Sequence, residues 1–327
     1  MRLNANLHTK NLFYMSNISK IPVEVFANYI VEKLRKVNPF VGFAVEESAF
    51  VLGGAVVHIP QAGSSPEVVK NRSTFPATAV MREDSFVDYA LGVFSTTPTH
   101  VTWHEENEIS YDKTDSVLND HVATLIEAVG DDLLYSWVAG LKNGAAETIP
   151  AANIIKTTGA AVAATEEGQT GSRKAFTAAD LAAAQTRMNK MSVPKGDRYA
   201  LLESYQYEQL LDSLSSNQMA AFQQTADLAS GIVGKLYGFN IMERSTVLAF
   251  NGNVPVAPGT AYTADTCVAA LCWQKESVAV AKGEIKPFQN TDDPQYYGDI
   301  FSAAVKAGGR CRRADWAGVI AIVSDKA

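Results

Sequence analysis

The sequence predicts an α+β fold, and three features of its 327 residues carry this prediction. Apolar residues recur every three or four positions over residues 117–141, which is the spacing of one buried helix face. The segment before that helix, from Tyr89 to Tyr111, is rich in the aromatic and β-branched residues that strands favour. After the helix, shorter helical and strand patterns alternate up to residue 323. Helices and strands mixed in this order are typical of an α+β chain.

The first ninety or so residues are predicted to form an arm and a projecting loop. Residues 23–36 read as an amphipathic helix that ends before Asn38-Pro39, because proline cannot continue a helix. A strand is expected from Val51 to Ile59, ended by Pro60. The segment from there to Asp88 contains Pro, Gly and Ser and few periodic apolar residues, so we expect it to project as a loop or hairpin.

The central helix is predicted to start near Val117 and to reach about Leu141. Thr114 or Asp115 can cap its start, since a short side chain with an oxygen accepts a free N–H of the first turn. Residues 142–172 are rich in Ala, Gly and Thr and read as a connector with one strand at Ile154-Ile155.

The second half of the chain is predicted to contain further helices and strands. Thr177 heads a helix that runs to about Met191, and Asp180 lies at the capping-box position. A strand at 198–202 and a helix at 205–214 are expected next. Residues 231–241 read as a glycine-containing turn that leads into a strand, and residues 246–250 are expected to extend that strand. The last expected elements are a helix at 267–278 and a buried closing strand at 319–323.

Composition and charge favour a globular chain that is not embedded in a membrane. The hydrophobic fraction is 47%, but no run approaches the roughly 18 apolar residues of a membrane span, and the N-terminus lacks the apolar run of a secretory signal, which indicates folding in a cytoplasm. Three cysteines without CxxC spacing favour buried thiols over disulfides or zinc. Residues 1–40 carry a net charge of +4, residues 83–132 one of −11 and residues 306–313 one of +4. This asymmetry indicates docking between charged segments.

No set of residues in the sequence predicts catalysis, a cofactor or a metal. The stretch Gly231 to Leu236 lacks the glycine spacing and the hydroxyl of a phosphate-binding loop, so a structural turn is the better interpretation. His100 and His104 lie close to several Glu residues, but their spacing on a strand places them roughly 13 Å apart, too far for one ion. A solvated acidic face is favoured there. We therefore expect no enzyme and no cofactor.

Several segments, taken in order, resemble those of one known family. They are Arg187-Met188-Asn189-Lys190-Met191, Val193-Pro194, the stretch from Gly196 to Leu202, Tyr205 to Leu211, the glycine-containing stretch Gly231 to Ile241, and the ending Arg313 to Val319. Together with the preceding arm, loop and helix, this order resembles the major capsid proteins of tailed bacteriophages, which have the Hong-Kong-97-type fold. The resemblance covers about Val23 to Val323.

The resemblance implies a Hong-Kong-97-like capsid fold. Its parts would be an N-terminal arm (1–50), an extended loop (51–88), a P-domain with a long spine helix (89–173), an A-domain (174–280) and a C-terminal segment that returns to the P-domain (281–327). It also implies self-assembly into hexamers and pentamers of an icosahedral head that encloses phage DNA. The expected location is the virion, after assembly in the host cytoplasm. Expected partners are further copies, a separate scaffolding protein, a portal and double-stranded DNA held by non-specific contacts, without a membrane.

Basic residues are the candidate contacts between subunits: Lys33, Arg35, Lys36, Lys70, Arg310, Arg312 and Arg313. The first three are expected to dock the arm on the acidic strand and spine helix of a neighbour, or else to form a solvated helix face. The three arginines could contact phosphates, or else form salt bridges between subunits or a solvated strand edge. Lys70 has no identifiable partners for an isopeptide cross-link. Two alternatives stay open, an encapsulin-like nanocompartment shell and a soluble enzyme with an unrecognised site.

Overall fold

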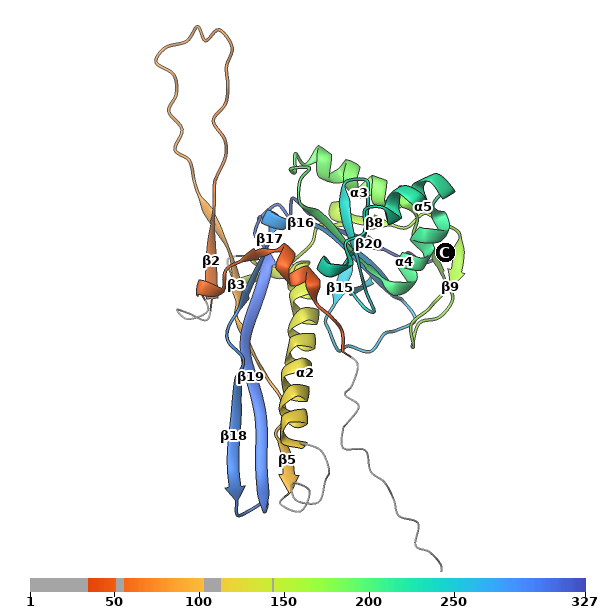
Figure 1. Ribbon diagram of the computed structural model, residues 1–327. Coiled ribbons are helices and arrows are strands. Elements are labelled where there is room, and N and C mark those ends of the chain that lie inside the picture. Colours follow the sequence, from red (N-terminus) through yellow and green to blue (C-terminus); the bar gives the residue numbers. More distant parts are fainter. Residues whose placement is uncertain (1–34, 51–55, 103–112, 143) are drawn as a thin grey trace, which may run out of the picture.

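The chain forms an elongated first lobe, a rounder second lobe and a long loop that projects from the first (Figure 1). This computed structural model describes residues 35–50, 56–102, 113–142 and 144–327. The first lobe consists of helix α2 (Lys113–Ser136) beside two long strands, β18 (Lys286–Asp293) and β19 (Gly298–Cys311). The helix and the strands come from distant parts of the sequence, so the lobe forms only when residues 278–311 return to it.

Strand β19 organises the sheet of the first lobe. The sheet has the order β1 (Val45–Glu46), β17 (Val278–Lys282), β19, β18, and β4 (Gly92–Ser95) and β5 (Thr99–Thr102) also pair with β19. Burial alternates along β19 from Phe301 to Ala307, as the pleat of a strand predicts, and every residue from there to Cys311 is buried. Ala303 and Val305 pack with Leu125 of α2. One face of the sheet therefore covers the helix.

Helix α2 confirms the predicted long helix but differs from it at both ends. It begins at Lys113, so Thr114 and Asp115 lie in its first turn, not at the cap, and it ends at Ser136. Leu141 belongs instead to strand β6 (Ala139–Lys142), which pairs with β7 (Ala145–Thr148) through a turn at Gly144 with φ +78°. The apolar spacing continues past the helix because Trp137 and Val138 are buried in the same core as Leu133 and Leu134 of α2.

A four-stranded sheet forms the base of the projecting loop, in the order β2 (Val56–Gln61), β3 (Ser85–Ala90), β6, β7. Pro60 lies inside β2 and does not end it, which corrects the prediction. The strand tolerates proline because β2 is an edge strand, where a missing N–H removes no bond to a neighbour. Residues 62–84 leave this sheet as the loop that the sequence predicted (Figure 1).

The second lobe is built on an eight-stranded sheet. Its strands run in the order β12 (Ile232–Leu236), β13 (Phe239–Arg244), β11 (Arg198–Glu203) and β16 (Thr266–Gln274), with β14 (Leu248–Asn251) and β15 (Val254–Val256) continuing from β16. On the other side of β16 lies β20 (Val319–Val323), which also pairs in parallel with β8 (Ile154–Lys156). The predicted strands at 154–155, 198–202 and 319–323 are confirmed.

Three helices lie against the second lobe's sheet: α3 (Ala178–Lys190), α4 (Ser204–Ser213) and α5 (Ser216–Gln223). The first two confirm the predicted helices, and α3 begins with the predicted capping box, in which the Asp180 carboxylate accepts from the Thr177 N–H at 2.9 Å. One core lies between the sheet and these helices and includes Phe176, Leu181 and Met188. The opposite face of the sheet packs on the first lobe.

The predicted helix at 267–278 is wrong, because these residues form β16, a short turn and the start of β17. All nine residues of β16 are buried, since both faces of the strand lie in core. A continuous apolar run of this kind does not distinguish a buried strand from a buried helix.

Short elements connect the longer helices and strands. Single helical turns span Pro39–Phe43, Ser48–Phe50, Ala151–Asn153, Leu228–Ser230 and Lys275–Ser277, and β9 (Ala161–Ala163) pairs with β10 (Ser172–Lys174). The predicted glycine-containing turn and strand at 231–241 are two strands, β12 and β13. Most of the predicted helix at 23–36 lies outside the described residues.

Candidate subunit-interface surfaces

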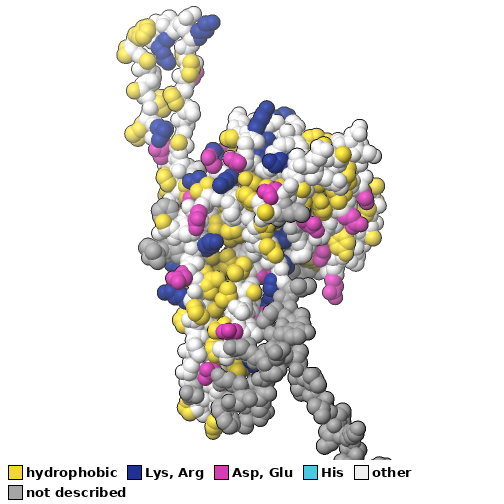
Figure 2. All heavy atoms as spheres, viewed as in Figure 1, with side chains coloured by type: hydrophobic (Ala, Val, Ile, Leu, Met, Phe, Trp, Pro, Cys, Tyr) yellow, Lys and Arg dark blue, Asp and Glu magenta, His cyan; other side chains and the backbone are white. Residues whose placement is uncertain are grey.

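The projecting loop exposes large apolar side chains. Val68 is 93% exposed, Val80 85%, Met81 82% and Phe75 75%. Figure 2 shows apolar side chains along the loop, well away from either lobe. Fully burying one such side chain typically contributes about 1.5–3 kcal/mol, and within its own subunit the loop gains little of this. Clustered exposed apolar side chains of this kind are typical of an interaction site.

The base of the loop is narrow and well defined. The Gly63 N–H donates to the Asp84 carboxylate at 2.8 Å, and this carboxylate also pairs with Arg82 at 2.7 Å. The Arg82 guanidinium and then the Gly63 N–H hold the pKa of Asp84 below its ordinary value. A Cβ at Gly63 would lie 2.0 Å from the Glu83 carbonyl oxygen, so only glycine allows the two chain segments to approach this closely.

An apolar groove runs along the first lobe, between α2 and the β19 side of the sheet. Its volume is about 320 Å³. Its lining includes Leu125, Ile126 and Val129 of α2, together with Ile285 and Val305. Ile126 is 46% exposed, and Figure 2 shows a stripe of apolar side chains along this lobe. The first lobe therefore presents an apolar surface, as the loop does.

Two of the predicted basic arm residues pair with the acidic face of α2 in the same chain. Arg35 bonds to Asp120 and lies 3.5 Å from Glu127, and these contacts raise the pKa of Arg35. Lys36 lies 3.5 Å from Glu127 and 3.1 Å from Asp131. Lys33 lies outside the described residues. The acidic face of α2 that was expected to receive a neighbour's arm is thus occupied by the chain's own Arg35 and Lys36, and a contact with a neighbour stays a prediction.

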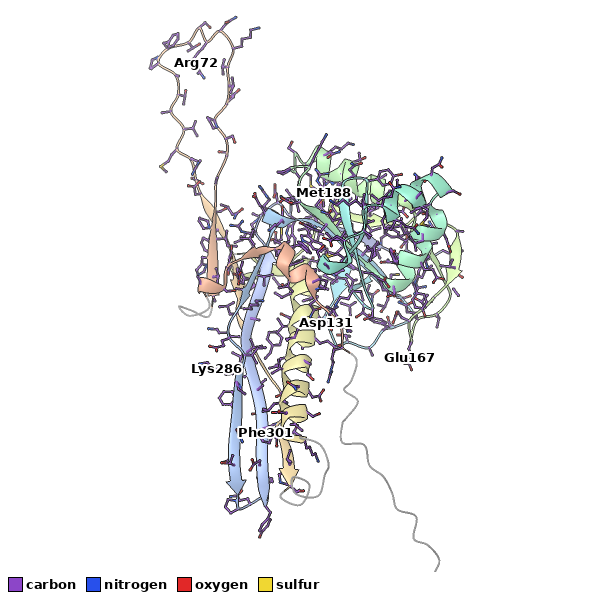
Figure 3. All side chains as sticks on the ribbon, in the orientation of Figure 1. Arg72, Asp131, Glu167, Met188, Lys286 and Phe301 are labelled. Atoms are coloured by element: carbon purple, nitrogen blue, oxygen red, sulfur yellow. The ribbon has the colours of Figure 1, made fainter. Side chains whose placement is uncertain are left out.

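Arg244 links the arm to both lobes, and no pattern in the sequence predicts this role. This β13 side chain is 2% exposed and lies 2.6 Å from the Asp131 carboxylate of α2. It also donates to Asn38 at 3.1 Å and lies 5.8 Å from the centre of the Phe40 ring. Figure 3 shows Asp131 at the end of α2 that is nearest the second lobe. Only the tertiary fold brings these residues together, and no local pattern marks them.

The three arginines near the end of β19 have different roles. Arg310 is fully buried, and burial lowers its pKa although Glu147 lies 3.0 Å away. It also donates to the Asp88 carbonyl at 2.9 Å. Arg310 therefore makes its ion pair inside the chain, and a contact between subunits through this residue stays a prediction. Arg312 is partly exposed and pairs with Glu47 at 3.1 Å, and Arg313 is exposed.

Lys70 lies on the exposed loop, where Figure 3 labels the nearby Arg72. Both side chains are exposed, and Figure 3 shows Arg72 near the end of the loop that is farthest from the two lobes. The loop thus combines cationic and apolar side chains.

Residues that could support chemistry are dispersed or buried. Within the described ranges, no three His, Cys, Asp or Glu side chains are grouped so that they could hold a metal ion. His100 packs against Tyr296, and His104 lies outside the described residues. Cys267, Cys272 and Cys311 are buried free thiols, and burial raises the pKa of Cys311 to about 12. None of the helices that the structure describes has the length and apolar character needed to cross a membrane.

Comparisons with known proteins identify the family. The family model described as phage capsid protein matches residues 106–325, about two thirds of the chain. No curated protein matches the chain.

Solved phage capsids share the fold across nearly the whole chain. The chain aligns with the cyanophage Pam1 capsid with a TM-score of 0.68 and 11% identity over 96% of this chain and 99% of that one. For the capsid of Ralstonia phage GP4 the TM-score is 0.64 with 12% identity, over 98% and 99% of the two chains. For Mycobacterium phage Che8 it is 0.60 with 17% identity, over 93% and 97%. The Hong-Kong-97-like α+β fold expected from the sequence is confirmed. The chain belongs to the phage capsid protein family and is a major capsid protein, a structural subunit of the phage head.

Proposed function

We propose that copies of this chain form hexamers and pentamers that close into an icosahedral head around phage DNA, with the loop of each copy seated on the first lobe of a neighbour. The observation that carries this proposal is the loop at residues 62–84, with Val68, Phe75, Val80 and Met81 exposed. The apolar groove beside α2 is the surface of matching character in the same chain. A contact between loop and groove buries both surfaces.

The strength of such a shell comes from repetition. One loop buries only a few apolar side chains, which is a modest contact by the standard of stable protein interfaces. In a closed ring every copy gives one loop and receives another, so that the contacts reinforce one another. We infer that single contacts are weak enough to exchange during assembly, whereas the complete shell persists.

In this proposal the first lobe is the P-domain, with α2 as its spine helix, and the second lobe is the A-domain. A scaffolding protein and a portal, supplied as separate chains in the host cytoplasm, would guide closure. Packaged DNA would contact the shell only through non-specific charge interactions. We assign the chain no catalytic activity. The family and the similar structures are phage capsids, so the nanocompartment shell is not favoured.

Electron microscopy of the expressed protein tests the proposal, with and without the scaffolding candidates encoded by neighbouring genes. We expect rings, tubes or closed particles in negative stain and a large mass by light scattering. Val80→Ser together with Met81→Ser on the loop, or Ile126→Ser in the groove, should reduce assembly sharply. These side chains are exposed, so the subunit should still fold.

Val254→Ser is the matched control, because Val254 is 61% exposed but lies on β15, outside both the loop and the groove. It should assemble as the parent does. A monodisperse monomer under every condition, scaffold included, would contradict the proposal. Assembly that is insensitive to the loop and groove variants would place the contact elsewhere.

A further inference from the structure

The two strands that carry the loop are both tied to Arg312. On β2, the Gln61 side chain donates to the Arg312 carbonyl oxygen at 2.8 Å, and its own oxygen accepts from the Ala314 N–H at 3.4 Å. One amide side chain therefore bonds to the backbone on both sides of residue 313. Gln61 is the last residue of β2, so this contact lies where the loop leaves the sheet.

On the other strand, a buried carboxylate makes the link. The Tyr89 hydroxyl of β3 donates to one oxygen of Glu47 at 2.9 Å, and Arg312 Nε donates to the other at 3.1 Å. Glu47 is 7% exposed and Tyr89 3%. Burial, and then the neighbouring Glu47 charge, raise the pKa of Tyr89 far above its ordinary value. Hydrogen bonds to a buried charge are among the stronger ones in proteins.

Together these bonds form a clamp, which we define as Glu47, Gln61, Tyr89 and Arg312. Gln61 holds the outgoing strand to the Arg312 backbone, and Tyr89 holds the returning strand, through Glu47, to the Arg312 guanidinium. Arg312 is itself fixed, because its N–H donates to the Ser277 carbonyl at 2.8 Å. The two strands that carry the loop are thus anchored to one residue of the first lobe, β2 at its last residue and β3 at Tyr89, opposite Val57.

The clamp lies at the base of the long projecting loop. Beyond the bond between Gly63 and Asp84, the loop extends far from either lobe (Figure 1). A small rotation at Gln61 therefore moves the loop's end through a large arc. The direction in which the loop leaves the subunit has to be set at its base.

The arm reaches the same clamp. Glu47 directly follows β1, which pairs in parallel with β17, and its N–H donates to the Val280 carbonyl at 2.8 Å. The segment that leads from the arm therefore supplies the carboxylate at the centre of the clamp. Arm and loop are linked through one side chain.

We propose that the four clamp residues, Glu47, Gln61, Tyr89 and Arg312, are positioning residues that fix the direction of the loop in the free subunit, before any neighbour is bound. If the loop seats on a neighbour, as the proposed function holds, this direction sets the angle between adjacent copies and hence the curvature of the shell. Loss of the clamp then widens the range of particle diameters and leaves the loop's own contact surface unchanged.

The test measures the loop's direction in unassembled subunits, so that it does not depend on the proposed function. Ser73→Cys on the loop and Asn119→Cys on α2 are both exposed sites for nitroxide labels, whereas the native thiols are buried. Pulsed electron paramagnetic resonance then gives the distribution of distances between the labels. The variants to compare are Gln61→Met, which keeps the side-chain length, and Tyr89→Phe, which removes only a hydroxyl.

We expect the double variant Gln61→Met, Tyr89→Phe to widen the distance distribution about two-fold, with Gln61→Met alone intermediate. Gln289→Met, on the exposed edge strand β18, is the matched control and should leave the distribution unchanged. A double variant with the parent's distribution overturns the clamp.

Imaging of assembled particles separates the two proposals. Wider label distances with a wider range of diameters support both. Wider distances with parental diameters support the clamp and contradict its link to curvature. If the parent does not assemble at all, the proposed function fails while the label distances still decide the clamp.

Discussion

Tyr237 and Gly238 form the two-residue turn between β12 and β13, and their φ angles are +48° and +77°. There is space for a larger side chain at residue 238, since a Cβ there would meet only the end of Gln185 at 3.7 Å. The positive φ of the backbone, however, disfavours any residue with a side chain at this position. Gly238→Val should destabilise the subunit by about 1–2 kcal/mol, because a left-handed conformation is unfavourable for a side chain and most of all for a β-branched one.

Urea denaturation and the yield of soluble protein measure this effect. Gly238→Asn is the matched control, since asparagine adopts positive φ more readily than other residues with a side chain. We expect the Asn variant to lose much less stability and to stay soluble, whereas the Val variant aggregates. A Val variant as stable as the parent would show that the turn can rearrange.

Arg310 should matter for folding. Arg310→Met leaves Glu147 without its cation and the Asp88 carbonyl without a donor, so we expect a loss of about 2–3 kcal/mol of unfolding free energy. Adding Glu147→Gln should restore part of that loss, since Glu147 is no longer an unpaired charge. Chemical denaturation of the two variants measures both effects. Arg313→Met, at an exposed neighbouring position, should leave stability unchanged.

Some residues could be interpreted from the sequence and others could not. The capping box of Thr177 and Asp180 was predictable because all of its bonds span three residues. Arg310 and Arg313 looked equivalent, yet one is fully buried and the other exposed. The difference depends on Glu147 and Asp88, which lie far away in sequence and reach Arg310 only in the folded chain.

At the scale of elements, the arm and α2 are linked by charge. Arg35 and Lys36 form ion pairs with Asp120, Glu127 and Asp131. The side chains on both sides of these pairs are roughly a quarter to a third exposed. Such pairs are worth about 0.2–1 kcal/mol each and weaken with salt. Arg35→Glu with Lys36→Glu converts this attraction to repulsion, so we expect assembly to slow most at low salt and to approach the parent's rate as added salt screens the charges.

Light scattering at low and high salt follows the assembly rate. The control is Lys190→Glu with Lys195→Glu, which makes the same change in net charge at exposed positions of the second lobe. Equal rates for the parent and the arm variant at both salt concentrations would mean that the arm's charge has no part in assembly. An equal slowing by the control would assign the effect to net charge alone.

The elements that the sequence placed correctly have a local signal, and those that it misplaced do not. Helix α2 and the loop were predicted from apolar spacing and from turn residues. The sequence predicts a helix in place of strand β16, because the buried run Thr266–Gln274 shows neither the alternation of a half-buried strand nor the spacing of an amphipathic helix, and so does not distinguish the two. The groove beside α2 was not predicted at all, because Ile285 and Val305 reach it from more than 150 positions away.

At the scale of the whole molecule, one core joins the two lobes. Trp137 follows α2 in the first lobe, and its indole N–H donates to the Ala279 carbonyl of β17 at 3.1 Å. Its ring lies 5.7 Å from that of Phe40 and 5.3 Å from that of Trp273 in the second lobe. The two lobes therefore share buried aromatic surface and should unfold together.

We expect the free subunit to give a single thermal transition, observed equally by circular dichroism and by tryptophan fluorescence. Trp137→Ala should cost about 3–5 kcal/mol and separate the transitions of the two lobes, because it removes the ring between them. Phe222→Ala removes a fully buried ring from the second lobe's other core, and should lower stability without separating the transitions. Calorimetry with two transitions in the parent would contradict the shared core.

Strand β20 has a consequence for the order of events during synthesis. It lies between β16 and β8, and β8 precedes it by more than 160 positions. Until the ribosome has released residues 319–323, the second lobe has an unfilled place beside β16, and the strand edges there are open to other chains. A nascent copy therefore cannot present a finished second lobe to its neighbours. We expect that only chains whose residues 319–323 have left the ribosome enter the shell, so that the timing of translation excludes subunits without β20.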